Sequence, residues 1–405
     1  MTPEIVITGA GVVSAIGCGK ADTLAALREG RSGVGPVRYL RTQLKDFPVG
    51  EVPLSNAELC KCTGAPAGWP RTTLLSILAI REALSQAGLM SGRHCLPSAS
   101  LRDPVRANAA GRQCLPLISG TTVGGMDLTE QQFPHYSAHH SCGGSTDLAA
   151  HFLGLSPATT LSTACSSAAN AIIFGANLLR AGRYARVVVG GSEGLSSYHL
   201  NGFHSLMILD AEPCRPFDAS RAGLNLGEGA AFLVLETLES ARERGVKPLA
   251  RLSGFGNACD AFHQTASSEN GEGAFLAMSQ ALTRAGVQPQ EIDYVNAHGT
   301  GTPNNDASES AALRRIFGEQ LPPVSSTKPF TGHTTSASGS IEAVFCLLAL
   351  QHGFIPRQLG WRTPDPSCVV PYTLSEMPRK PLRHILCNAF GFGGNDSSIL
   401  LSACE

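Results

Sequence analysis

Charged side chains are scarce in this sequence. Asp, Glu, Lys and Arg together make up 16% of its 405 residues, whereas an average globular domain has roughly 25%. The formal net charge is only −1, which excludes the strong basic field that nucleic-acid or membrane-surface binding needs. A surface with so little charge predicts that a large face is covered in an oligomer.

Long hydrophobic runs are also missing. The longest, residues 343–350, is much shorter than the roughly 20 residues that span a bilayer, so no transmembrane helix is expected. The first residues, Met1 to Glu4, have neither the positive charge nor the apolar stretch of a signal peptide. Thirteen cysteines, an odd number without regular spacing, differ from a secreted disulfide framework and favour a reducing cytoplasm.

Complete metal-binding patterns are absent from the sequence. Cys60 and Cys62 form a close pair, but no second pair follows at the spacing of a zinc site. His135 and His139 are four residues apart and His140 follows, yet no third ligand is apparent for the same face. We therefore expect no metal site and interpret the histidines as part of a polar surface stretch.

What the sequence does contain is a regular alternation of short β-branched strands and longer helical segments. Strands are expected at 5–8, 115–119, 186–189, 232–235, 249–255 and 292–295, with helices at 71–88, after Cys165 to Arg180, and at 274–285. This alternation predicts an α/β protein with largely parallel sheets. The charged segment 238–245 suggests a boundary between an N-terminal half, 1–240, and a C-terminal half, 241–405. Residues 92–113 are expected to form an irregular surface insertion.

Two glycine-rich stretches match functional turns only in part. Gly9-Ala10-Gly11 follows a predicted strand, but the third glycine and the acidic residue of a dinucleotide site are missing. A plain strand-to-helix turn is therefore expected there. Residues 190–194 read Gly-Gly-Ser-Glu-Gly and match the nucleophile elbow of α/β hydrolases. A hydrolase centred on Ser192 thus remains an alternative.

The strongest candidate nucleophile is Cys165. It stands between a threonine-rich strand and a helix, so the positive end of the helix dipole is expected to favour its thiolate. The small residues 166–169 leave room for an acyl chain or another backbone to approach. The other cysteines have no comparable surroundings.

Two histidines lie in similar surroundings downstream. His298 follows the strand 292–295 in Asn-Ala-His-Gly-Thr-Gly-Thr, and His333 ends the stretch Ser-Thr-Lys-Pro-Phe-Thr-Gly-His. Residues 388–395 form a further glycine-rich turn that can direct backbone N–H groups. One thiol, two imidazoles and a donor-rich loop are suited to acyl transfer followed by attack of a carbanion.

These four stretches together resemble β-ketoacyl-acyl-carrier-protein synthases, the elongating condensing enzymes of the thiolase superfamily. The stretches 215–218, 226–230 and 260–263 agree with the same family. The resemblance covers the chain from about residue 4 to residue 400 and implies a thiolase-like, duplicated α-β-α-β-α five-layer fold. It also implies acyl carrier protein as a partner, phosphopantetheine carried by that protein, no cofactor of the chain's own, and a homodimer or a heterodimer with a chain-length-factor-like paralogue.

The resemblance assigns roles to individual residues. Cys165 would hold the acyl chain, and His298 and His333 would stabilise the enolate formed when malonyl-acyl-carrier protein loses CO₂. Phe392 resembles the gating aromatic residue, and its backbone N–H, with that of Cys165, would form the oxyanion hole. The remaining assignments are substrate contacts at Thr300, Thr302 and Phe390, a charge pair of Lys328 with Glu342, and an acidic cluster of Asp306 and Glu309. For the last two residues a capping box is the alternative.

The same residues narrow the subclass. Initiating enzymes of the family carry Asn in place of His333, and silent chain-length factors lack the nucleophile that is present here as Cys165, so an active elongating enzyme is favoured. A non-catalytic partner subunit remains the alternative. Asn395-Asp396 differs from the Thr-Asn of housekeeping members, and residues 199–203 resemble synthases of aryl-polyene or flexirubin-type pathways. Arg71 is a weak candidate for carrier-protein docking.

Overall fold

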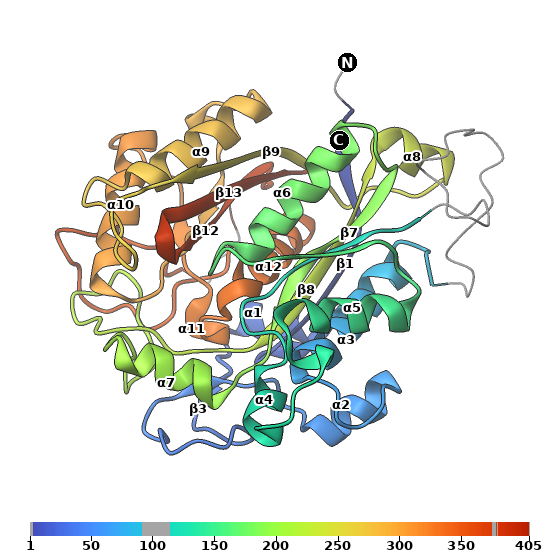
Figure 1. The fold of residues 1–405 in the computed structure, drawn as a ribbon. Coiled ribbons are helices and arrows are strands. Elements are labelled where there is room, and N and C mark those ends of the chain that lie inside the picture. Colours follow the sequence, from blue (N-terminus) through green and yellow to red (C-terminus); the bar gives the residue numbers. More distant parts are fainter. Residues whose placement is uncertain (1–2, 91–113, 375–377, 379, 405) are drawn as a thin grey trace.

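A computed structural model describes residues 3–90, 114–374, 378 and 380–404 (Figure 1). The predicted insertion at 92–113 lies outside these residues. The strands are β1 (Ile5–Ser14), β2 (Gly17–Cys18), β3 (Val34–Gly35), β4 (Val49–Gly50), β5 (Leu117–Gly120), β6 (Ala158–Leu161), β7 (Arg186–Glu193), β8 (Gly229–Thr237), β9 (Ala250–Cys259), β10 (Tyr294–Asn296), β11 (Val324–Ser325), β12 (His384–Gly391) and β13 (Asn395–Ser402).

The helices cover most of the segments between these strands. They are α1 (Lys20–Glu29), α2 (Asn56–Thr63), α3 (Arg71–Gln86), α4 (Met126–Gln132), α5 (Cys142–Leu153), α6 (Ser167–Arg180), α7 (Ser197–Ser205), α8 (Leu238–Glu243), α9 (Glu272–Ala285), α10 (Pro303–Phe317), α11 (Lys328–Thr331) and α12 (Ser338–His352). Short 3₁₀ helices lie at 138–140, 289–291, 335–337 and 392–394. The charged segment 238–245, where the sequence suggests a boundary between halves, contains α8, in which Ser240 and Ala241 are buried.

The strand order repeats itself along the chain. The main sheet runs β11-β10-β12-β13-β9-β1-β8-β7-β5-β6. In this order β1, β5, β6, β7 and β8 are the first to fifth strands of the N-terminal half, and β9 to β13 are the first to fifth of the C-terminal half. Read from its outer edge inward, each half has the order third, second, fourth, fifth, first, and the antiparallel pairing of β1 with β9 joins the two halves. Helices α3 and α5 cover one outer face, α9 and α10 cover the other, and α6 and α12 lie between (Figure 1). The expected α/β class and duplicated five-layer arrangement are confirmed. The expected largely parallel sheet is wrong: β5 and β10 pair in parallel with their neighbours, but the pairings β1–β8, β7–β8, β9–β13, β12–β13 and β1–β9 are antiparallel.

Glycines in β1 show the same duplication at atomic scale. The strand continues through Gly9 and Gly11 to Ser14, so the predicted turn at this point is wrong. A Cβ at Gly9 or Gly11 would lie 2.1 or 2.0 Å from a carbonyl oxygen of α3, and one at Gly254 or Gly256 would lie 2.1 or 2.0 Å from a carbonyl of α9. The glycines are there because a helix packs directly on each strand.

The nucleophile elbow suggested for residues 190–194 is also wrong. Strand β7 runs on to Glu193 and pairs with β8 along this length, so Ser192 lies within a strand and not on a sharp turn. Its side chain is buried, and its hydroxyl is bonded to the hydroxyl of Ser76 at 2.6 Å. Without a turn to expose the hydroxyl, the hydrolase alternative has no structural basis.

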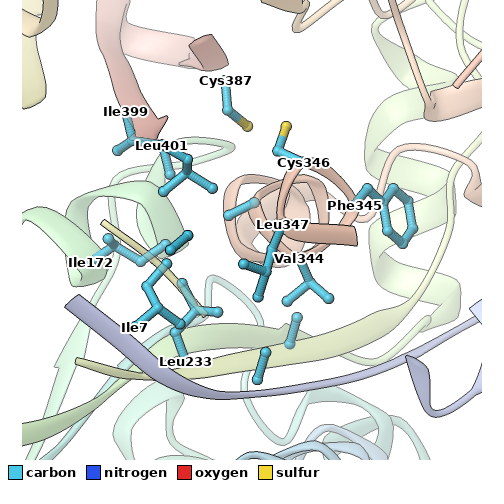
Figure 2. Close-up of a cluster of buried hydrophobic side chains, with 14 of the residues drawn as sticks. Ile7, Ile172, Leu233, Val344, Phe345, Cys346, Leu347, Cys387, Ile399 and Leu401 are labelled. Carbon is cyan, nitrogen blue, oxygen red and sulfur yellow. The ribbon is translucent and has the colours of Figure 1, made fainter. Parts of the chain in front are cut away.

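The apolar run 343–350 forms most of α12, the central helix. Its side chains are buried on every side, as expected for a helix enclosed by other elements. Figure 2 shows Leu347 and Val344 directed toward Leu233 of β8, while Cys346 faces Cys387 of β12. In the described part of the chain, no helix combines the length and hydropathy needed to span a membrane. Because α12 packs against both halves, it holds the residues at its N-terminus in the middle of the molecule.

Candidate active site

Cys165 lies at the turn between β6 and α6, as the sequence predicts. The turn is sharp: Ala164, just before it, has a φ of 52°, in the left-handed region that disfavours residues with a Cβ. The Ser167 hydroxyl stabilises the turn, since it accepts from the N–H of Thr163 at 2.9 Å and donates to the carbonyl of Ala164 at 2.6 Å. Cys165 itself is only 5% exposed.

His333 is in direct contact with this thiol. Its Nε2 lies 3.0 Å from Sγ of Cys165, and its Nδ1 lies 3.0 Å from the hydroxyl of Ser338. His298 stands across the same space, with its ring centre 5.3 Å from that of His333 and nearly perpendicular to it. The two histidines and the cysteine come from distant segments, and the repeated halves bring them to one point.

The imidazoles are neutral at physiological pH. Burial lowers the pKa of both His298 and His333 well below the usual value, and the nearby ammonium of Lys328 lowers both further. Burial also raises the pKa of the Cys165 thiol to about 12, although Lys328 and the N–H of Phe392 act in the opposite direction. The thiolate expected from the helix dipole is therefore wrong for the resting site. The thiol keeps its proton, and neutral His333 lies within reach to accept it.

Lys328 organises the His298 side of the site. It begins α11, is completely buried, and forms an ion pair with Glu342 of α12 at 2.7 Å. Its ammonium also donates to the carbonyl oxygen of His298 and lies 3.4 Å from Nδ1 of that residue. With Nδ1 facing an ammonium, the ring proton of neutral His298 belongs on Nε2, where it is available as a donor.

The acidic residues of α10 hold the histidine loop and do not cap their helix. Glu309 accepts from the N–H groups of His298 and Gly299 at 2.9 and 2.8 Å, and from the side chain of Asn388 at 3.0 Å. Asp306 accepts from the N–H of Gly301 at 3.2 Å. No side chain caps α10 at its N-cap, so the capping-box alternative is wrong.

The loop after β12 approaches the thiol from the opposite side. The N–H of Phe392 is directed at Sγ of Cys165. Asn395 fixes this loop: its Oδ1 accepts from Ser166 at 2.8 Å, Asn170 at 2.7 Å and Asn257 at 3.0 Å. Neither this junction nor Ser338 was recognised in the sequence, because single Ser and Asn residues carry no spacing signal. The hydrogen bonds of Asn395 tie the nucleophile turn to the C-terminal half.

A cavity of about 310 Å³ opens at these residues. The rings of Phe203 and Phe392 stack within its lining, 6.0 Å apart and 20° from parallel. The hydroxyls of Thr300 and Thr302, which bond to each other at 2.8 Å, also line it. The other lining residues include Cys165, His298, His333, Phe390, Leu206, Ile208 and Leu224. Every residue predicted as catalytic or substrate-binding lines this cavity, except Lys328, which lies behind His298.

Two further candidates lie elsewhere. Arg71 is buried and forms a two-pronged ion pair with Glu228 at 2.6 and 2.7 Å, so it is not available to dock a carrier protein. His140 accepts from the N–H of Ser137 in an exposed 3₁₀ turn. Among the described residues no group of His, Cys, Asp or Glu has the arrangement of a metal site.

Comparisons with known proteins identify relatives over most of the chain. The model of the β-ketoacyl synthase N-terminal domain matches residues 72–241, and that of the C-terminal domain matches 249–362. Nodulation protein E of Rhizobium meliloti (strain 1021) is 32% identical over 98% of both chains. The solved ishigamide ketosynthase/chain length factor superposes with a TM-score of 0.89 at 30% identity over 100% of both chains. The ketosynthase ApeO, solved with its chain length factor ApeC from Xenorhabdus doucetiae, gives 0.81 at 32% over 99% and 98%.

Proposed function

The chain belongs to the β-ketoacyl synthase family, and we propose that its reaction, an acyl transfer and a decarboxylative condensation, runs through Cys165, His298 and His333. The contact of 3.0 Å between Nε2 of His333 and Sγ of Cys165 carries this assignment. It gives a neutral base in reach of a protonated nucleophile, which is the arrangement that covalent acyl transfer needs.

Acyl transfer begins at the thiol. As Sγ of Cys165 attacks the carbonyl carbon of an acyl thioester, its proton passes to Nε2 of His333, and the N–H groups of Cys165 and Phe392 stabilise the oxyanion. The tetrahedral intermediate then collapses, the C–S bond to the carrier's phosphopantetheine breaks, and the departing sulfur takes the proton from His333. The acyl chain is left as a thioester of Cys165.

Condensation follows with a malonyl thioester. Its C–C bond to the carboxylate breaks, CO₂ leaves, and Nε2–H groups of His298 and His333 stabilise the enolate oxygen. The enolate carbon then attacks the acyl carbonyl, the C–S bond to Cys165 breaks, and the departing thiolate takes up one proton from solvent to restore the resting thiol. Nε2 of His333 must therefore accept a proton in the first step and donate a hydrogen bond from Nε2–H in the second. The Ser338 hydroxyl permits both, because it can accept from Nδ1–H or donate to Nδ1.

The proposal also covers the partner that delivers the substrates, the assembly and the pathway. The hydroxyls of Thr300 and Thr302 at the cavity are suited to bind phosphopantetheine, so acyl carrier protein is the partner that delivers both substrates. Assembly with a paralogous chain-length-factor-like subunit is supported by the heterodimer of the similar ketosynthase ApeO. For the pathway we assign polyene synthesis, because residues 199–203 resemble synthases of aryl-polyene pathways and residues 395–396 differ from those of housekeeping members. We place the chain in the cytoplasm, where the free thiols of its described cysteines are stable, and divide it at residue 240, within α8.

Intact-mass analysis tests the nucleophile. Incubation with acyl-carrier protein should add one acyl group to the wild-type chain and none to Cys165→Ala. Cys214→Ala is the matched control, because burial raises the pKa of that thiol to about 12 as well, yet it does not line the cavity. An unmodified wild-type chain would instead favour a non-catalytic partner subunit.

Decarboxylation tests the histidines. His298→Ala should still accept the acyl group, since His333 remains beside the thiol, but should release CO₂ from malonyl-carrier protein at least about 100-fold more slowly. His333→Ala should slow both steps. Unchanged CO₂ release in both variants would contradict the enolate role.

A further inference from the structure

A buried imidazole near the cavity has no part in the chemistry described above. His199 lies on α7, is 7% exposed, and its Nδ1 has no hydrogen-bond partner among the described residues. Leaving such an atom unpartnered in an apolar interior costs free energy, and native proteins usually avoid it. Where they do not, an ordered water or a ligand supplies the missing bond.

The position of His199 links it to the acyl cavity. Its ring packs edge-on against Phe203, one helical turn along α7, with ring centres 5.2 Å apart. Phe203 in turn stacks on Phe392 at 6.0 Å, so the His199 ring is at most about 11 Å from the ring beside the nucleophile. His199 also helps to lower the pKa of His333, which agrees with this short range.

The surroundings of His199 are mainly apolar. Leu195 and Leu200 on either side are buried in one cluster with Leu224, and Leu224 also lines the cavity. Burial lowers the pKa of His199, so the ring is neutral and offers either a donor or an acceptor at Nδ1. His199 does not itself line the cavity: it packs behind Phe203, which does, and the nearby carboxylate of Glu193 opposes the effect of burial on its pKa. A neutral imidazole behind an apolar lining adds selectivity for a polar group that reaches it and contributes little to binding a plain hydrocarbon.

We infer that His199 is a specificity-determining residue that binds a hydroxyl group on the distal part of the acyl chain. The inference rests on the proposed function, since the chain must be held on Cys165 and must pass the Phe203–Phe392 pair to reach His199. A hydroxyl suits the site because it can donate or accept, and therefore pairs with either tautomer of the ring. The favoured substrates are hydroxylated acyl chains in place of simple saturated ones.

Rates of Cys165 acylation test this assignment. Carrier-protein thioesters of saturated acids from butanoyl to dodecanoyl are compared with their ω-hydroxy analogues by intact-mass analysis. The wild-type chain should prefer the hydroxylated substrate by about tenfold at the length that reaches His199. His199→Leu should abolish this preference and leave acylation by an acetyl thioester unchanged, because an acetyl group is too short to reach the ring.

His204 provides the matched control. It lies on the same helix, is exposed, and packs against Phe47, so His204→Leu should keep the preference for the hydroxyl. His199→Leu should also unfold at the same temperature as the wild type or higher, because it removes an unpartnered buried nitrogen. A preference below about twofold at every chain length, or one that survives His199→Leu, would overturn the inference. Absence of acylation with every thioester, acetyl included, would overturn the proposed function and this inference with it.

Discussion

Replacing Lys328 with methionine is expected to destabilise the fold, and to do so more strongly as the pH rises. The ammonium of Lys328 and the carboxylate of Glu342 lie 2.7 Å apart with side chains 1% and 4% exposed. Removing one member of such a pair leaves the other buried and uncompensated. Glu342 has a second oxygen, Oε2, without a hydrogen-bond partner in the described structure, so nothing else offsets its charge.

The magnitude follows from the pKa of the carboxyl group. Burial raises the pKa of Glu342 to about 7, from an ordinary value of about 4.5, even while Lys328 lowers it. The unfolded chain therefore binds fewer protons than the folded chain between these values, and stability falls as the pH rises through this window. Without Lys328 the pKa rises further. We expect Lys328→Met to lose about 3 to 5 kcal/mol at pH 8 and only about 2 kcal/mol at pH 6, where the carboxyl group is easily kept protonated.

Urea unfolding at pH 6 and pH 8 measures this loss. The double variant Lys328→Met with Glu342→Leu removes both charges and should recover most of the stability at pH 8. The reasoning is refuted if the single variant is as stable as the wild type at pH 8, if its deficit is the same at both pH values, or if the double variant is no more stable than the single one.

Three further predictions concern stability away from the reacting atoms. Arg71→Leu leaves Glu228 buried without its partner and should cost about 3 to 5 kcal/mol in urea unfolding; a change below 1 kcal/mol would mean that the ion pair is not essential. Gly11→Ala should lower the melting temperature, since its Cβ would lie 2.0 Å from a carbonyl oxygen of α3, whereas Gly35→Ala, with no atom within 4 Å of its Cβ, should change it little. Burial and the charge of a neighbouring carboxylate raise the pKa of Asp396 to about 8, so wild-type stability should fall as the pH rises toward 8; Asp396→Asn should flatten that fall, and parallel pH profiles for the two proteins would contradict it.

The reacting residues could be found in the sequence because each lies in a short stretch rich in glycine or other small residues, near the end of a strand. Cys165 follows β6, His298 follows β10, and His333 follows the short β11 and the single turn of α11. The carboxyl ends of strands in an α/β sheet are where ligands bind, so residues at these points can be expected to meet. The same local reasoning failed for Gly9 and Ser192, which lie within long strands. A glycine that admits a packed helix and a glycine that makes a turn look alike in sequence.

The α/β class and the cysteine and histidines of the site could be predicted from the sequence, because periodicity and motif order are local properties of the chain, whereas the duplicated architecture was implied only by the resemblance to a known family. Only the tertiary structure decided their protonation: burial keeps the thiol of Cys165 protonated and both imidazoles neutral, against the thiolate expected from the helix dipole. It also decided that Arg71 is an internal ion-pair partner, and that the Nδ1 of His199 has no hydrogen-bond partner within the described part of the chain. Desolvation and hydrogen-bond partnership depend on what surrounds a group in space, and segments far apart in the chain supply those surroundings.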